Sequence, residues 1–300
     1  CSKKYSDNES AFEGDNRIKM ARANRHFISG YAWYLTHRCH KREFLLKFTK
    51  DKERWMHWLF EAKKRFSLCI LNFTVTSNHV HLLVYDTGSG NETIPKSIQL
   101  IAGKTGQEFN TRKRRKGAYW QDRYHATAVA TDDHLLRCMV YIDLNMVRAG
   151  VVKHPKDWPF CGYRYISVPP QRYRLTDNRK LMELMNIEEI DRFCETYRKW
   201  VDAAIMQGDI KRQPQWTESI AVGDKVWVEK VKDQMGYKAI GRKVVENSDS
   251  YVLKEAQQPY RNISDRGIRG IRVQPDNNTF YWQSGTEARA DLDTSLEMSF

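Results

Sequence analysis

The sequence predicts an α+β fold, on three observations. Segments with alternating or β-branched apolar residues, which are typical of strands, occupy residues 31–37, 68–76, 78–85 and 125–130. Segments with apolar residues at helical spacing lie at 50–66 and 94–112. The resulting order of strand, helix, strand, strand, helix, strand is the split βαβ arrangement of ferredoxin-like folds. We therefore expect a ferredoxin-like antiparallel sheet with helices on one face, followed by a mainly helical C-terminal region.

Local residue patterns justify the first half of this fold. The strand at 31–37 is rich in aromatic residues, and the helix at 50–66 is amphipathic. The strand at 68–76 is apolar and β-branched, and a tight connection leads from it into the strand at 78–85. Two glycines and an asparagine predict a loop at 87–93.

The second half begins with the helix at 94–112, which has Ile98 and Ile101 among its apolar positions. The strand at 125–130 follows, and residues 131–150 then read as a helix that ends at a glycine. The apolar stripe of this helix comprises Leu135, Met139, Ile142 and Met146.

The strand at 78–85 carries the first candidate site. Side chains two residues apart on a strand project to the same face, so Val80 and Leu82 point into a core while His79 and His81 point out of it together. Two neutral imidazoles on one face can share a divalent ion. The alternative is a pair of unrelated surface histidines on an edge strand.

The helix at 131–150 carries the second candidate site. Tyr141, Asn145 and Arg148 stand at i, i+4 and i+7 and form a polar line on an otherwise apolar helix. Tyrosine can attack phosphorus, asparagine can complete a metal shell, and arginine can hold a phosphate. The alternative is a tyrosine at the edge of the core and an arginine that balances the helix dipole. In the ferredoxin-like arrangement this helix follows the fourth strand and can reach the open sheet face on which the histidines lie.

Composition indicates the class of partner. The net charge is +13, with a sequence pI near 9.4, which favours a polyanionic partner, and nucleic acid fits better than an acidic membrane surface. No window is apolar enough to span a membrane. The six cysteines form no Cys-x-x-Cys pair, and Cys69 and Cys138 lie in apolar runs as reduced core residues do.

A basic and aromatic cluster supports nucleic-acid binding. Residues 101–124 hold seven basic and two acidic side chains, with aromatic residues interleaved. The alternative is a solvated basic loop, which needs no aromatic residues. The predicted DNA-binding residues are Arg112, Lys113, Arg114, Arg115, Lys116, Trp120, Gln121, Arg123 and Tyr124, together with Arg148.

Four motifs occur in order along the chain. They are Asn-His-Val-His-Leu-Leu at 78–83, Tyr-Trp-Gln-Asp-Arg-Tyr at 119–124, Tyr-Ile-Asp-Leu-Asn-Met-Val-Arg-Ala-Gly at 141–150 and Trp-Pro-Phe at 158–160. Together they resemble the REP-associated tyrosine transposases of bacteria, a branch of the single-tyrosine transposases in the His-hydrophobic-His (HUH) endonuclease class. Thr76-Ser77 stands where these relatives commonly have Met-Pro, and Met146 stands where many have proline.

The resemblance implies a metal-dependent single-strand DNA endonuclease and strand transferase that cleaves and rejoins DNA next to hairpins. Tyr141 is then the nucleophile, which forms a 5′-phosphotyrosine link and releases a 3′-hydroxyl. His79, His81 and Asn145 hold Mg²⁺ or Mn²⁺. The implied partner is single-stranded DNA with REP-like hairpins, bound by a monomer or homodimer in the bacterial cytoplasm, in association with the nucleoid.

The expected organisation has four parts. Residues 1–19 form a disordered extension, 20–165 the transposase/nuclease domain, 166–256 the mainly helical region and 257–300 a poorly ordered tail. Two alternatives to strand transfer stay open at this point. In one, water attacks the phosphate and Tyr141 is structural; in the other, the chain is a domesticated protein that binds DNA or RNA hairpins without cleaving them.

Overall fold

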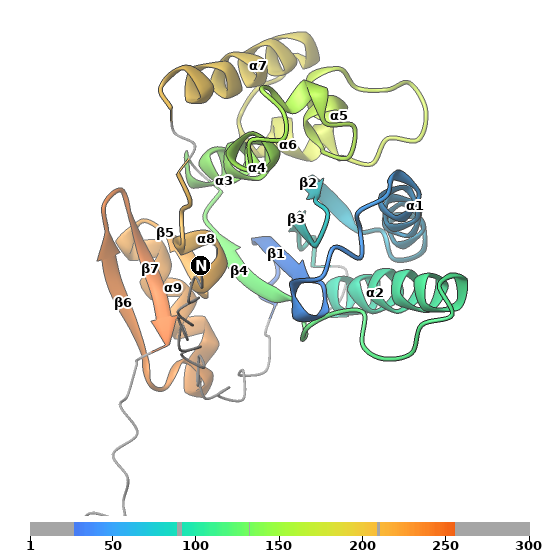
Figure 1. Ribbon diagram of the computed structural model, residues 1–300. Coiled ribbons are helices and arrows are strands. Elements are labelled where there is room, and N and C mark those ends of the chain that lie inside the picture. The colour runs from blue at the N-terminus through green and yellow to red at the C-terminus, as the bar shows by residue number, and fades with distance from the viewer. Residues whose placement is uncertain (1–26, 89–91, 132, 209–210, 256–300) are drawn as a thin grey trace, which may run out of the picture. The chain divides into compact units, whose positions relative to one another are not determined.

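The computed structural model describes residues 27–88, 92–131, 133–208 and 211–255, all of which belong to one compact unit (Figure 1). The predicted extension at 1–19 and the predicted tail at 257–300 lie outside the described residues.

Six elements form the predicted ferredoxin-like core. They are β1 (Ala32–Arg38), α1 (Thr49–Phe66), β2 (Cys69–Val75), β3 (His79–Tyr85), α2 (Thr93–Arg112) and β4 (His125–Val129). These strands are antiparallel in the order β2-β3-β1-β4. The predicted fold class is therefore confirmed.

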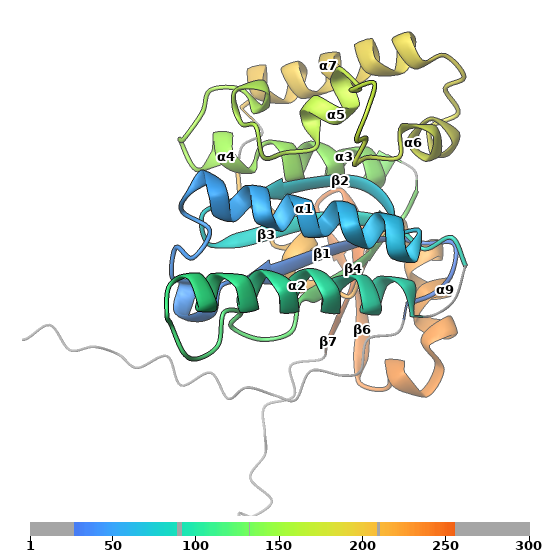
Figure 2. The same cartoon turned by 90° about the vertical axis from the view of Figure 1, so that its right-hand side faces the viewer.

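One face of the sheet is covered by α1 and α2, which lie side by side across it (Figure 2). Trp55 and Leu59 of α1 and Ile98 of α2 pack in the same core as Val80 and Leu82 of β3. The predicted inward-facing residues of β3 and the predicted apolar faces of both helices thus meet in this layer.

The opposite face is also covered, so the expectation of an open second face is wrong. Tyr34 of β1, Leu83 of β3, Met139 and Tyr197 share a second core on this side. The sequence pattern of β3 did not reveal that this second face is buried, because two of its positions are histidines, whereas a buried sheet face usually carries aliphatic side chains. The covering elements are α3 (Asp133–Asp143), α4 (Asn145–Arg148), α5 (Tyr163–Ser167), α6 (Asn178–Leu184) and α7 (Ile190–Met206) (Figure 1).

The C-terminal region is largely helical but adds three strands to the sheet. After α8 (Gln215–Glu218) come β5 (Ala221–Gly223), α9 (Lys225–Met235), β6 (Arg242–Asn247) and β7 (Ser250–Glu255). Strand β5 pairs parallel to β4, and the seven strands follow the order β2-β3-β1-β4-β5-β7-β6. Short 3-10 turns lie at η1 (His40–Arg42), η2 (Pro155–Asp157) and η3 (Gly236–Ala239).

The helix predicted at 131–150 is interrupted. Helix α3 ends at Asp143 and α4 begins at Asn145, while Leu144 between them has φ −74° and ψ 3°. The end is as predicted, because Gly150 adopts φ +68°, a conformation that glycine adopts without strain. Tyr141 and Asn145 therefore lie on two successive helical segments rather than on one continuous face.

A buried polar network fixes the end of α3. The Asp143 carboxylate accepts hydrogen bonds from Asn72 Nδ2 at 3.1 Å and from the Tyr197 hydroxyl at 2.5 Å, and Asn72 Nδ2 also donates to the Met139 carbonyl at 3.1 Å. These bonds link α3 to β2 and α7, so the segment that carries Tyr141 is held from two sides.

Two predictions about the chain as a whole can be checked against the part of it that is described. Cys69 and Cys138 are free and buried, as predicted, and so are Cys39, Cys161 and Cys194, for which no such prediction was made. Across 27–255, outside the three short gaps, no helix has both the length and the apolar character needed to cross a bilayer.

Candidate active site

The two histidines of β3 face the second core together. In the antiparallel register His81 lies opposite Thr36 and His79 opposite Arg38, so both imidazoles lie on the sheet face that carries Tyr34. Their ring centroids are 4.6 Å apart, with the planes inclined by 78°. His81 is only 3% exposed, because α3 and α4 cover the face that we expected to be open.

The hydrogen bonds of the two rings define their tautomers. His79 Nδ1 lies 2.7 Å from Asn78 Oδ1, which can only accept, so the ring proton is on Nδ1. His81 Nε2 lies 2.7 Å from Asn145 Nδ2, which can only donate, and His81 Nδ1 therefore donates to the hydroxyl of Tyr34. In both rings the lone pair is consequently on Nε2.

Both imidazoles are neutral near pH 7. Burial, together with the smaller effect of the nearby guanidinium groups of Arg38 and Arg148, lowers the pKa of His79 to about 4. Burial also lowers the pKa of His81 well below its usual range, with smaller contributions from His79 and the two arginines. Neutral rings with an unprotonated Nε2 are what metal ligation requires.

The hydrogen bonds of His79, His81 and Asn145 leave a set of ligand atoms that fits a divalent ion. Partners on Nδ1 that fix the tautomer and the ring orientation are a regular feature of histidines that bind metals. A half-turn of the Asn145 amide presents Oδ1 where Nδ2 now lies. In the described ranges no place gathers three or more His, Cys, Asp or Glu side chains, so the candidate ligands are two imidazoles and one amide. Such a set leaves coordination positions for water and phosphate oxygens.

Tyr141 lies on α3 over the same sheet face. Its ring is 6.4 Å from that of Tyr34, at an interplanar angle of 89°, and Tyr34 in turn contacts His81. The guanidinium of Arg148 lies 4.0 Å from the centroid of the Tyr141 ring and donates to the Tyr141 carbonyl at 2.8 Å. Phenol, amide, guanidinium and the two imidazoles are thus brought to one place.

The phenol of Tyr141 is protonated at neutral pH. Burial raises its pKa above the usual range, while Arg148, Arg212 and a hydrogen bond with the backbone of Gln213 act in the opposite direction. The side chain is 6% exposed, and Trp216 packs near it with ring centroids 6.4 Å apart. The surrounding cations are therefore placed to favour an anionic oxygen once the proton is lost.

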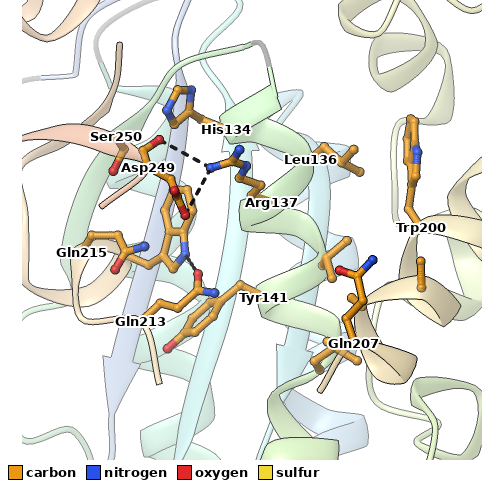
Figure 3. Close-up of a pocket in the computed structure, with 15 residues that line it drawn as sticks. His134, Leu136, Arg137, Tyr141, Trp200, Gln207, Gln213, Gln215, Asp249 and Ser250 are labelled. Carbon is orange, nitrogen blue, oxygen red and sulfur yellow. Dashed lines mark hydrogen bonds and ion pairs between the residues drawn. The ribbon is translucent and has the colours of Figure 1, made fainter. Parts of the chain in front are cut away.

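A cavity of about 280 Å³ reaches the tyrosine (Figure 3). Tyr141 lines it from α3, and the segment that contains Gln213 and Trp216 lines the opposite side, where Trp216 Nε1 donates to Gln213 Oε1 at 2.6 Å. Arg137 lies at the far end and contacts the Asp249 carbonyl at 3.4 Å. The phenol is therefore accessible from a preformed hollow although it is largely buried.

The predicted DNA-binding residues divide into engaged and exposed groups. Arg112 pairs with the buried carboxylate of Asp51, and Arg115 lies 3.5 Å from Glu43 and donates to the Ala118 carbonyl at 2.9 Å. The exposed members are Lys113, Arg114, Lys116, Gln121 and Arg123.

The two predicted aromatic members are partly occupied by protein contacts. Trp120 stacks on His37 at 4.1 Å and donates to the Ala102 carbonyl at 3.0 Å, while Tyr124 is half-buried beside Phe27 at 6.5 Å. The backbone of Gln121 donates to the Arg38 carbonyl at 2.9 Å. The end of this basic cluster therefore lies beside β1, but its two aromatic rings pack against the first core, on the sheet face opposite the histidines.

Three residues at the site were missed in the sequence: Tyr34, Arg38 and Arg212. Tyr34 and Arg38 lie on β1 on the face of the histidines, and the alternation of that strand indicated their face but not its pairing with β3. Arg212 comes from the segment after α7, for which no pattern predicted a return to the site. Thr76, one of the departures from the usual motif, also holds His79, with Oγ1 2.9 Å from Nδ1.

Comparisons with known proteins give one family match and two similar solved structures that are described here. The family model described as "Transposase IS200 like" matches residues 30–145, a span that contains both histidines, Tyr141 and Asn145. No curated protein matches the chain.

Among solved structures, a REP-associated tyrosine transposase bound to a REP hairpin is 23% identical, over 53% of this chain and 94% of that one, with a TM-score of 0.43. A candidate transposase from Deinococcus radiodurans R1 is 14% identical, over 44% of this chain and 92% of that one, with a TM-score of 0.29. The similarity to IS200-like transposases that the family model gives therefore covers residues 30–145 of this chain.

Proposed function

We propose that the chain cleaves and rejoins single-stranded DNA next to hairpins, with Tyr141 as the nucleophile. The observation that supports this best is the convergence of Tyr141, Asn145 and the pair His79 and His81 on one sheet face, although the chain separates them by about sixty residues. Neither a structural tyrosine nor a pair of surface histidines accounts for this convergence.

The cleavage step is a transesterification. The Tyr141 oxygen forms a bond to phosphorus and loses its proton, while the bond from phosphorus to the 3′-oxygen of the preceding nucleotide breaks and that oxygen takes up a proton. The products are a 5′-phosphotyrosine and a free 3′-hydroxyl. Because the phosphotyrosine keeps the energy of the ester, attack by a 3′-hydroxyl rejoins DNA without ATP.

His79, His81 and Asn145 would hold Mg²⁺ or Mn²⁺. When bound, the ion polarises the scissile phosphate and offsets the charge that develops on it. The protein contributes the neutral Nε2 lone pairs and the Nδ1 partners that orient both rings.

Three arginines are the candidates to bind the scissile phosphate. Arg148 lies over the Tyr141 ring, Arg38 lies opposite His79, and Arg212 acts on both Tyr141 and Arg38. Burial lowers the pKa of Arg38, and the neighbouring cations Arg42 and Arg212 add to that effect. Cations gathered around a protonated phenol are stabilised when an anionic phosphate enters.

We expect the DNA that flanks the hairpin to bind along the exposed part of the basic cluster at residues 112–124. Arg112 is held in an ion pair with Asp51, whereas the exposed side chains of Lys113, Arg114, Lys116 and Arg123 contribute phosphate contacts that are independent of sequence.

The test uses end-labelled single-stranded hairpin DNA with Mn²⁺, resolved on a denaturing gel. The proposal predicts a protein-linked band that is absent in Tyr141→Phe and present in the control Tyr31→Phe, whose hydroxyl contacts Gln234 away from the site. Cleavage without the band and retained in Tyr141→Phe indicates attack by water. Hairpin binding with no cleavage under any divalent metal indicates a binding protein.

A further inference from the structure

A second cavity, of about 740 Å³, lies outside the active site and is lined by residues of α5, of the loop that follows it and of α7. Its volume falls in the range of ligand pockets, roughly 300–1,000 Å³. It is formed after the matched transposase domain ends at residue 145. We call this cavity the basic recess. Its lining includes Lys156, Arg164, Arg172, Arg198, Tyr165 and Tyr173.

The charge of the basic recess is uncompensated. Its lining includes four cationic side chains and no carboxylate. Within the ranges that the structure describes, none of these cations forms an ion pair with an acidic side chain. Cations that converge on a cavity without a carboxylate fit an anionic ligand, and the net charge of the chain favours the same partner.

Aromatic side chains stand beside these cations. Tyr173 is 75% exposed and adopts a φ of +57°, which a bulky residue rarely does. Its ring contacts Phe60 of α1 edge-on at 5.7 Å, which leaves a ring face open, and Tyr165 lies deeper against Phe73 at 5.6 Å. Exposed aromatic rings next to cations are the combination that binds unpaired bases.

The walls of the basic recess are held in place before any ligand arrives. Arg198 Nη1 donates to the Ser167 carbonyl at 2.8 Å, which ties α7 to the end of α5. Lys63 Nζ on α1 donates to the carbonyls of Arg174 at 2.9 Å and Leu175 at 2.8 Å. The loop that carries Tyr173 is thereby anchored to the transposase domain, so ligand binding requires little ordering of the chain.

We propose that the basic recess binds single-stranded DNA, with Arg164 and Arg172 on backbone phosphates and a base stacked on Tyr173. This inference rests on the proposed function, because it assigns the recess to a stretch of the same DNA that flanks the cleaved hairpin. A hollow that includes one exposed and one half-buried tyrosine favours single strands over a duplex, whose bases are already stacked inside the helix.

The test measures binding of fluorescein-labelled oligo(dT) of twelve nucleotides by anisotropy, in EDTA and in a Tyr141→Phe background, so that no cleavage enters. Replacing Arg164 and Arg172 by alanine is expected to weaken binding about tenfold at low salt. The log–log salt slope should become shallower by ~0.7 for each lost phosphate contact. The matched control replaces Lys225 and Lys230 of α9, which are equally exposed, and should change neither quantity.

Stacking has its own test. Tyr173→Ala should weaken oligo(dT) binding at least fivefold, whereas Tyr173→Phe, which keeps the ring, should bind as the parent does. Equal losses for the arginine pair and its control overturn the inference. The inference is also overturned if the variants lose binding to a blunt duplex as much as binding to oligo(dT), because that result indicates a general phosphate surface. Binding of phosphatidylserine vesicles in place of DNA overturns it as well.

The two proposals can fail separately. Loss of oligo(dT) binding in the recess variants, together with absence of a phosphotyrosine adduct in wild-type protein that carries Tyr141, removes the proposed function but keeps the DNA site. An adduct in the wild type with unchanged oligo(dT) binding in the recess variants removes only the recess. Melting of each variant by circular dichroism identifies any unfolded chain, and Tyr173→Phe provides a folded comparison.

Discussion

The Asp143 carboxyl makes stability depend on pH in a way that can be measured. It is 1% exposed and bonded to Asn72 and Tyr197, and burial raises its pKa from 3.8 to about 7 against the weaker opposing effect of those bonds. The substitution Asp143→Asn removes the titration but keeps the contacts, because an amide oxygen accepts from Asn72 and its NH₂ group donates to Tyr197.

The sign and size of the effect follow from linkage. An acid whose pKa is raised on folding holds its proton more tightly in the folded state, so its contribution is fully present below about pH 4 and is lost as the pH rises through about 7. At about 1.4 kcal/mol per pKa unit, integration between pH 5 and pH 8 gives a loss of about 2–3 kcal/mol in the free energy of unfolding.

The assay is urea denaturation of metal-free protein at pH 5 and pH 8. Wild type should lose about 2–3 kcal/mol more than Asp143→Asn over this interval, while the control Asp233→Asn, an exposed carboxylate on α9, should follow wild type. The difference between variants isolates Asp143 from the histidines, whose lowered pKa values destabilise the fold toward acid pH instead. Parallel pH profiles for wild type and Asp143→Asn would refute the reasoning.

Three further predictions concern packing, metal binding and the basic segment. Gly162→Ala places a Cβ 2.1 Å from a side-chain oxygen of β2 and should lower the free energy of unfolding by ~1–3 kcal/mol. Gly103→Ala has open space around the new Cβ and should raise that free energy by ~0.5–1 kcal/mol, and urea titration distinguishes the two variants. Tyr34→Phe removes the partner of a candidate ligand and should weaken Mn²⁺ binding ~10–100-fold in an electron paramagnetic resonance titration; an unchanged affinity contradicts that role. Arg112→Ala, which leaves a buried carboxylate unpaired, should lower the melting temperature, whereas Lys116→Ala should leave it unchanged and weaken DNA binding; the reverse pattern would contradict the division of the cluster.

Local patterns were sufficient for the ferredoxin-like core. Alternation in β3 placed Val80 and Leu82 on one face and His79 and His81 on the other, and the structure confirms both. Helical spacing likewise predicted α1 and α2. These features depend on residues close in sequence, which is the range over which side-chain periodicity is informative.

Features that depend on distant segments were not predictable from these patterns. The second face is buried because α7 and its neighbours return to it, and β5 joins the sheet after some ninety residues. The break at Leu144 leaves the apolar spacing of the helix unchanged, so periodicity gave no sign of it. For the same reason Arg212 could not be assigned to the site, since its approach to Tyr141 depends on a chain reversal that no local motif encodes.

The most direct measurement is to locate the covalent bond. Protein incubated with a single-stranded hairpin oligonucleotide and Mn²⁺ is digested with nuclease and protease, and the peptides are sequenced by mass spectrometry. We predict a residual nucleotide on the peptide that contains Tyr141, attached through its 5′-phosphate to that side chain. Cleaved DNA with an unmodified Tyr141 peptide, or with the nucleotide on another residue, would contradict the assignment of the nucleophile.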